Sequence, residues 1–386
     1  MWGGDKNERK KKKGAAKDSL LSTPTAKTGT RKTVAAIGRK TEEFSMTNHS
    51  LSVRQIQVLF FLDLLGISML YLPSMVAKWG GGYCAVWLGC GVLVWALFGA
   101  MAAECSGKEL AQSGLGRVLL LFFAGKNLLQ GAVWLRLMAG SLSVLLLPKT
   151  PLVLTEGAMV LLLWYGVTKG PACRGRAAEV LLLPVVLILF AVCAFSMAGV
   201  ELEKLVPSAP VGAGKTIGLV ALSGFGVENI LFASAFCSQK KAGKAVALSG
   251  VLLALVLAAL TALSYAVFGG TGMTIRRYPL LQLMDTIDFP LLFVERQDVW
   301  MVGVWLWSVF LFLWSCLFFC GWQFAQVVQR GKERWYALGA AVVMLALAQL
   351  VVTEAAAMFF LQGLLWMNGL SLILILGLFL KERSRA

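Results

Sequence analysis

The sequence predicts an all-α polytopic membrane protein with ten transmembrane helices, arranged as two halves of five. Hydrophobic residues make up 58% of the 386 residues. Apolar runs of about 20 residues, the length that crosses a bilayer core, recur along the chain, and they lack the strict alternation of β-barrel strands. The first and sixth spans are interrupted at corresponding places in the two halves, a pattern typical of a membrane binding site.

The ten predicted spans follow one another with short connections. They cover residues 53–79, 84–103, 115–147, 152–168, 177–199, 214–239, 243–268, 297–322, 335–353 and 357–380. Within a membrane domain of residues 46–386, the first five spans form repeat one (53–199) and the last five form repeat two (214–380). The longest outer connection, 269–296, contains YPLLQLMDTIDFP, which predicts short helices lying on the outer face.

Residues 1–45 are rich in Lys, Thr, Gly and Ser, and this composition predicts a disordered basic tail. No apolar stretch follows the basic cluster closely, so a cleavable signal peptide is not expected. The segment is interpreted as a cytoplasmic tail or as an over-extended start before Met46. The net charge of +16 lies mostly in this tail and in loops on one side of the spans. This pattern places both termini in the cytoplasm and argues against nucleic acid as a partner.

The first span carries Gly66, Ser68 and Pro73 near its centre, and glycine and proline disfavour a helix interior. Freed backbone groups persist in a membrane only where they are buried in protein or line a polar cavity. We therefore expect an unwound segment at Gly66, Ile67 and Ser68, whose N–H groups suit a carboxylate. The alternative is that glycine here serves close packing of helices.

The sixth span contains the second predicted break, at Ser223, Gly224, Phe225 and Gly226. It offers a further set of free backbone groups. Together the two breaks are expected to hold the carboxylate and the amine of an amino acid near the bilayer midplane.

Charged residues inside spans are costly and therefore candidates for function. Asp63 and Lys126 each lie nine residues from the cytoplasmic start of their helices, which places both about 14 Å deep. An ion pair between them is one hypothesis, with the lysine replacing a coupling cation or carrying a proton. A structural pair, or a lysine reaching back to the inner surface, is the other. Gln130 either lines a cavity or bridges helices, and Glu228 either pairs with a basic group or orients the second break.

No metal, cofactor or catalytic centre is expected from the sequence. The eight cysteines are scattered through apolar runs without a CxxC pair and read as packing residues. The only histidine, His49, precedes the first span. An intramembrane triad that uses histidine is thereby excluded, and an enzyme is not expected.

Several stretches resemble one known family. They are SVRQIQVLF, LLGISMLYLP, GFGVE, PLLQLMDTIDF and FVERQD, the last leading into a Trp-rich span. Across residues 50–380 the chain is similar to the endospore germination permeases (the GerAB/GerKB type) of the amino acid–polyamine–organocation superfamily. The most specific part of the resemblance is the combination of the first-span Gly…Pro segment with Glu295, Arg296 and Asp298. These three charged residues are also candidate gating or ion-pair groups.

The resemblance implies a LeuT-like fold of five plus five inverted helices, with helices one and six discontinuous. It also implies the B-type subunit of a germinant receptor in the inner spore membrane, which senses a small nutrient, usually an amino acid, beside an A-type membrane subunit and a C-type lipoprotein. The family's binding positions correspond here to residues 66–68 and 223–226. One departure is that the chain has Gly66-Ile-Ser68 where the superfamily often has Gly-x-Gly. A proton- or sodium-coupled amino-acid permease is the main alternative, and a purely structural subunit is another.

Overall fold

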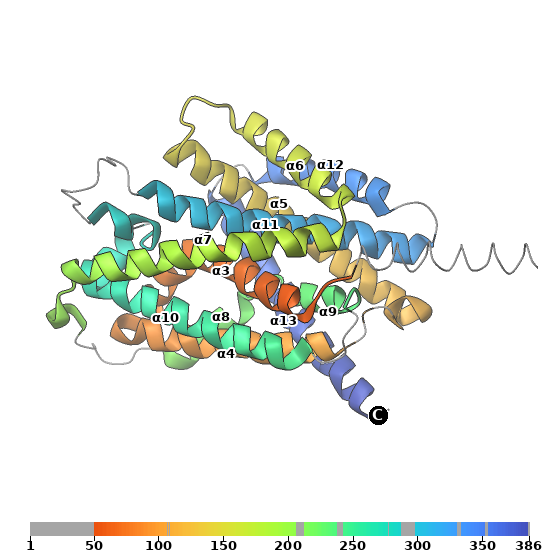
Figure 1. Cartoon of the computed structure of the whole chain (residues 1–386), viewed down its shortest axis with the longest axis horizontal. Coiled ribbons are helices and arrows are strands. Elements are labelled where there is room, and N and C mark those ends of the chain that lie inside the picture. Colours follow the sequence, from red (N-terminus) through yellow and green to blue (C-terminus); the bar gives the residue numbers. More distant parts are fainter. Residues whose placement is uncertain are drawn as a thin grey trace, which may run out of the picture. The chain divides into compact units, whose positions relative to one another are not determined.

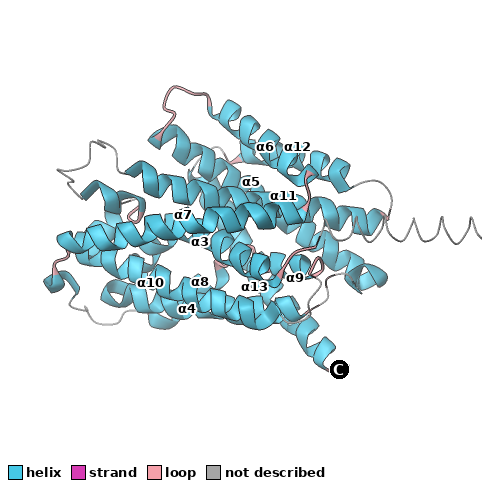
Figure 2. Cartoon of the chain, viewed as in Figure 1, coloured by secondary structure: helices cyan, strands magenta, loops and turns pink. Residues whose placement is uncertain are grey.

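The computed structural model describes residues 50–105, 107, 109–205, 212–237, 242–276, 278–286, 298–329, 333–351 and 354–384. The predicted tail (1–45) and the candidate residues Glu295 and Arg296 lie outside the described residues, as does the side chain of Asp298. Within the described ranges the regular structure is helical, and the β pairing is one isolated bridge between Leu51 and Cys237 (Figure 2).

Several long helices, among them α3, α7 and α11, run alongside one another in Figure 1. The bounds of all the α-helices of the described chain are α3 (Val53–Gly80), α4 (Cys84–Glu104), α5 (Gly114–Leu145), α6 (Leu152–Thr168), α7 (Pro171–Ser196), α8 (Ala213–Leu222), α9 (Asn229–Ser234), α10 (Ala242–Ile275), α11 (Asp298–Val328), α12 (Glu333–Leu350) and α13 (Glu354–Arg383). Short 3-10 turns connect them at Gly81–Tyr83, Glu109–Gln112, Met197–Gly199, Leu202–Leu205 and Leu281–Thr286.

The predicted fold class is confirmed. Each expected span coincides with one helix, except the sixth, which is divided into α8 and α9. Six helical segments of the described chain are long and apolar enough to cross a membrane, the first of them (Val53–Glu104) containing both α3 and α4. Large apolar side chains on the outer faces of α7 and α13 are exposed, including Phe190 (73%) and Trp366 (81%), as lipid-facing residues are. The chain is therefore an integral membrane protein.

Helix α11 lies at the centre of the packing. It contacts α3, α5, α6, α7 and α12. Its most apolar stretch is 78% buried inside the protein, more than in the other five segments of the described chain that could cross a membrane. Its buried aromatic residues include Trp305, Phe312 and Phe319. Helix α10 packs mainly on α4 and α3. Both α5 and α11 meet the divided sixth span, α5 through the Lys126–Glu228 pair and α11 through contacts with α9.

The unwinding expected in the first span does not occur. Helix α3 continues from Val53 to Gly80 through Pro73, and the Ser68 hydroxyl donates a hydrogen bond to the Leu64 carbonyl one turn earlier. Gly66 instead permits close helix contact, because a Cβ there would lie 2.6 Å from the backbone nitrogen of Val309 in α11. Close packing, the alternative considered for this glycine, is what the structure shows.

The break in the sixth span is present. Helix α8 ends at Leu222, and residues 223–228 form irregular turns before α9 begins at Asn229. Gly226 has φ +90°, a left-handed conformation that favours glycine. Gly224 lies against Trp95, since a Cβ on Gly224 would fall 2.5 Å from the Trp95 ring. Both glycines are thus required by the local geometry.

The packing of Gly66 gives a first testable expectation. Gly66→Ala forces α3 away from the α11 backbone, so we expect a loss of about 1–3 kcal/mol in the free energy of unfolding. Gly125→Ala on α5 is the matched control, because a Cβ there meets no atom within 4 Å. The measurement is the thermal unfolding of both purified variants in detergent. Equal melting temperatures for the two variants would contradict this role of Gly66.

Candidate functional site

The irregular segment between α8 and α9 is held at both ends by buried side chains. At the α8 end, the Trp95 indole donates to the carbonyls of Val220 (2.9 Å) and Ala221 (3.1 Å). The Asn368 side-chain amide, from α13, donates to the Leu222 carbonyl at 2.7 Å. The Ala221 and Leu222 carbonyls are among those that the end of a helix leaves without an intrahelical partner, whereas the Val220 carbonyl also accepts from the backbone N–H and the hydroxyl of Ser223. The break is therefore stabilised by side chains from two other helices.

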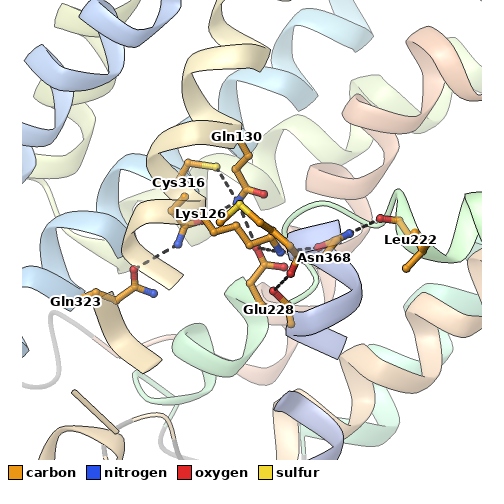
Figure 3. A network of polar contacts seen from close by, with 10 residues as sticks. Lys126, Gln130, Leu222, Glu228, Cys316, Gln323 and Asn368 are labelled. Carbon is orange, nitrogen blue, oxygen red and sulfur yellow. Dashed lines mark hydrogen bonds and ion pairs between the residues drawn. The ribbon is translucent and has the colours of Figure 1, made fainter. Parts of the chain in front are cut away.

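At the α9 end, Glu228 forms a buried ion pair with Lys126 of α5. The Lys126 ammonium lies 2.8 Å from the Glu228 carboxylate, and the two side chains are 0% and 1% exposed. The same ammonium donates a hydrogen bond to the side-chain oxygen of Asn368. Lys126 and Asn368 thus connect the two ends of the break to each other (Figure 3).

A chain of neutral hydrogen bonds extends this network along α5 and α11. The Gln130 amide donates to the side-chain oxygen of Asn127 at 2.7 Å, and the same nitrogen lies 3.3 Å from Glu228 and 3.5 Å from the Cys316 sulfur. Asn127 in turn donates to Gln323 at 3.4 Å. Polar groups in hydrocarbon need such partners, and here they join helices to one another. Figure 3 shows Gln130 and Cys316 close to Lys126, with Gln323 farther away to the left.

The expected pair of Asp63 with Lys126 is wrong. Asp63 pairs with Arg174 in the first turns of α7, and Arg174 also donates to the Leu311 carbonyl of α11 at 3.2 Å. In the sequence Arg174 falls between two predicted spans, 152–168 and 177–199, so it was not a candidate partner for Asp63. The sequence identified the two acidic residues, Asp63 and Glu228. The similar depth of Asp63 and Lys126 in the membrane could not show which basic residue each acid faces.

A third ion pair lies between α5 and α6. The Arg136 guanidinium lies 3.0 Å from the carboxylate of Glu156, whose side chain is fully buried. Arg136 also donates to the Val351 carbonyl at 3.0 Å, and Gln349 of α12 donates to the other Glu156 oxygen. Each intramembrane charge in these pairs therefore has a partner, as the cost of burying it requires. The sequence suggested no partner for Arg136.

Aromatic rings surround the break on the side of α5 and α11. Trp134 contacts Phe225 edge-on (centroids 6.4 Å apart), Phe312 (6.3 Å) and Tyr71 (6.2 Å). Phe225, the aromatic residue of the break, is 4% exposed. An apolar site with a few polar groups suits a small ligand. Phe312 and Tyr71 were not singled out from the sequence.

The candidate ligand-binding residues separate into two groups. Ser223, Gly224, Phe225 and Gly226 lie in the break, and the N–H groups of Gly224 and Gly226 make no hydrogen bond within the described part of the chain. Residues 66–68 are helical and buried in α3, so they offer no unwound backbone. Asn368 and Asn229, which the sequence analysis missed, had no signal beyond being polar residues inside or beside apolar runs.

Comparisons with known proteins bear on the family and the fold of the chain. A protein-family model described as "Spore germination protein" matches residues 50–355. Two solved structures share the fold: the nucleobase–cation symporter Mhp1, in a closed conformation with bromovinylhydantoin bound (TM-score 0.56, 16% identity, 81% of this chain and 75% of that one), and a Na⁺-coupled sialic acid symporter in a substrate-bound outward-open state (TM-score 0.60, 11% identity, 86% and 78%). No curated protein sequence matches the chain.

The Lys126–Glu228 pair gives a second testable expectation. Lys126→Met or Glu228→Gln alone leaves a buried charge without its partner, so each is expected to lower the free energy of unfolding by about 3–5 kcal/mol. In the double variant the loss should fall short of the sum by at least about 1 kcal/mol. Denaturant unfolding of the purified protein measures all three.

The control cycle combines Lys126→Met with Asp63→Asn. Because these residues pair with different partners, their effects should add to within about 0.5 kcal/mol. Strong coupling in the Asp63 cycle together with additivity in the Glu228 cycle would overturn the assignment of the pairs.

Proposed function

The chain belongs to the spore germination protein family, and from this premise we propose that it is a nutrient-sensing subunit of a germinant receptor. In this proposal a small nutrient, with amino acids the first class to test, binds at the break between α8 and α9. Binding then changes the balance between two conformations of the helices around the break. A ligand can do this only if its affinities for the two conformations differ.

The observation that carries the proposal is the break itself. An irregular segment inside a membrane domain is costly, and this chain stabilises one with Trp95, Asn368 and the Lys126–Glu228 pair. Free N–H groups at Gly224 and Gly226 lie beside buried aromatic rings. Such a combination of unpaired backbone donors and apolar walls suits a small polar molecule.

The proposed site differs from the one expected from the sequence. Because α3 is unbroken, the ligand is bound from the sixth span together with α5 and α11, and not between two unwound segments. The ligand-binding residues we retain are Ser223, Gly224, Phe225 and Gly226. Gly66 acts in helix packing, so a bulky substitution there would disturb the fold whether or not a ligand binds.

The network around the break also suggests how binding is transmitted. Lys126 lies on α5, in the predicted first repeat, and Asn368 lies on α13, in the predicted second. A ligand that displaces residues 223–228 therefore acts on both halves at once. We propose that this movement reaches partner subunits, namely an A-type membrane subunit and a C-type lipoprotein, in the inner spore membrane, with both termini of this chain in the cytoplasm.

A coupled permease is the second candidate function. It is favoured by the shared fold with two symporters, one of them described as a nucleobase–cation symporter and the other as Na⁺-coupled. In that case the buried charges of Asp63, Lys126 and Glu228 would serve ion or proton coupling. A sensor and a permease need the same binding site, and they differ in whether the nutrient is accumulated.

Transport measurements in proteoliposomes separate the two. The purified full chain is given a panel of labelled amino acids with and without imposed proton and sodium gradients, and binding and net uptake are both scored. We expect saturable binding without accumulation. Gradient-driven accumulation would make the chain a permease first. Absence of binding across the panel would contradict an amino-acid ligand.

Phe225→Ala provides the site-directed part of this experiment. Removing the aromatic residue of the break should weaken the observed binding at least about tenfold, because a buried aromatic contact of this size contributes more than 1.4 kcal/mol. Phe359→Ala on α13 is the matched control, since that ring is 73% exposed and faces lipid. Equal losses in the two variants would argue against binding at the break.

A further inference from the structure

The charged side chains around the break have partners, whereas several neutral polar groups there have none in the described part of the chain, and this difference indicates what kind of ligand would fit. The charged side chains are paired, as Glu228 is with Lys126. Near the break, the buried atoms without a hydrogen-bond partner among the described residues include only neutral groups: both polar atoms of Asn229, the indole nitrogen of Trp134, the side-chain oxygen of Gln130 and the hydroxyl of Ser315. The site therefore offers hydrogen bonds but little unpaired charge.

Asn229 is the member of this set that lies at the break itself. It is the first residue of α9 and is 2% exposed. Its side-chain nitrogen lies 3.6 Å from the position that a Cβ on Gly226 would occupy, and the Phe312 ring lies 2.7 Å from the same position. Trp134 contacts both Phe312 and Phe225. The unpartnered carboxamide thus lies near the Phe312 ring of α11, and that ring in turn contacts Trp134 of α5.

A carboxamide presents a donor and an acceptor side by side. A buried amide with neither satisfied is costly to the protein, and a partner that satisfies both recovers that cost. The complementary group carries an acceptor next to a donor in one plane, which is the edge of another amide. Aromatic rings beside it suit the flat faces of such a group.

A charged partner fits the surroundings less well. The carboxylate cradle expected in the first span is absent because α3 is unbroken. The charged residue with an unpartnered buried oxygen is Asp63, and its other oxygen already pairs with Arg174. Bringing an ionised ligand group beside Asn229 would require its desolvation without a counter-charge.

We propose that Asn229 is the specificity-determining residue of this site and that it binds the amide edge of an uncharged ligand group, either a primary carboxamide or a cyclic amide. The proposal rests on the function proposed above and deepens it. The carboxamide of an amino acid and the ring edge of a pyrimidine share this chemistry, and they are separated by the choice of probes.

The test measures the affinities of the full chain in lipid nanodiscs for four labelled probes. L-Asparagine carries a carboxamide, L-aspartate and L-leucine are its charged and apolar counterparts of similar shape, and uracil is a cyclic amide without amino-acid charges. We expect L-asparagine or uracil to bind at least about 100-fold more tightly than L-aspartate and L-leucine, as in sites built to hydrogen-bond a ligand. Whichever of the two binds identifies the source of the amide edge.

Asn229→Leu should abolish this preference without lowering the melting temperature of the unliganded protein. The reason is that the carboxamide has no partner to lose in the unliganded state, whereas a structural asparagine would lower the stability when replaced. Thr261→Val on α10 is the matched control, because it removes another buried unpartnered polar atom from a helix that packs on α3 and α4. The control should leave all four affinities unchanged.

Three results would overturn the assignment. These are equal binding of L-leucine and L-asparagine, unchanged affinities in Asn229→Leu, and failure of both amide probes to bind. Saturable binding of L-leucine or L-aspartate in any of these cases keeps the proposed binding function and removes only the role of Asn229. A lack of binding by every amino acid in the proteoliposome panel contradicts the proposed amino-acid function instead.

Discussion

The structure depends on one constraint, namely that backbone groups freed inside a membrane must find partners within the protein. The break between α8 and α9 exists because side chains from other helices meet this requirement. Trp95 and Asn368 bind the carbonyls at the end of α8, and Lys126 joins Asn368 to Glu228 at the start of α9. The ion pair is as much a support for the backbone as an interaction between charges. Removing any of these groups exposes polar atoms to an environment that offers no replacement.

The same constraint explains the difference between the two interrupted spans. In α3 the backbone stays helical, the Ser68 hydroxyl binds within its own helix, and Gly66 brings α3 against α11. The continuous helix α3 thus packs on the central helix α11. The divided sixth span, α8 and α9, is held by side chains from other helices. A site built on the divided helix can respond to a ligand while α3 and α11 keep their packing. In the proposed mechanism the movement therefore begins at residues 223–228.

Much of the fold followed from the sequence because hydrophobic length and loop charge are strong signals in membrane proteins. The ten spans were predicted in this way. The second break at Ser223–Gly226 was predicted from the glycines that interrupt the sixth span, and Asp63, Lys126 and Glu228 were identified as charged residues inside or beside spans. The partners of those charges could not be predicted, because a helical register fixes depth but not which neighbour a side chain faces. For the same reason Arg174 and Asn368 were missed. The interruption at Gly66 was misjudged because glycine serves close packing and unwinding equally well. The Ser308–Val309 backbone, against which Gly66 packs, lies far from it in the sequence, so the sequence did not show this contact.

The central claim is that the segment between α8 and α9 is the ligand-binding element. Hydrogen–deuterium exchange of the full chain in lipid nanodiscs tests it most directly, with and without the amino acid that binds most tightly. The account predicts that ligand slows exchange at the amides of residues 223–229, above all at Gly224 and Gly226, with smaller changes in α3. Slowing confined to residues 64–70 of α3, with no change at 223–229, would contradict it.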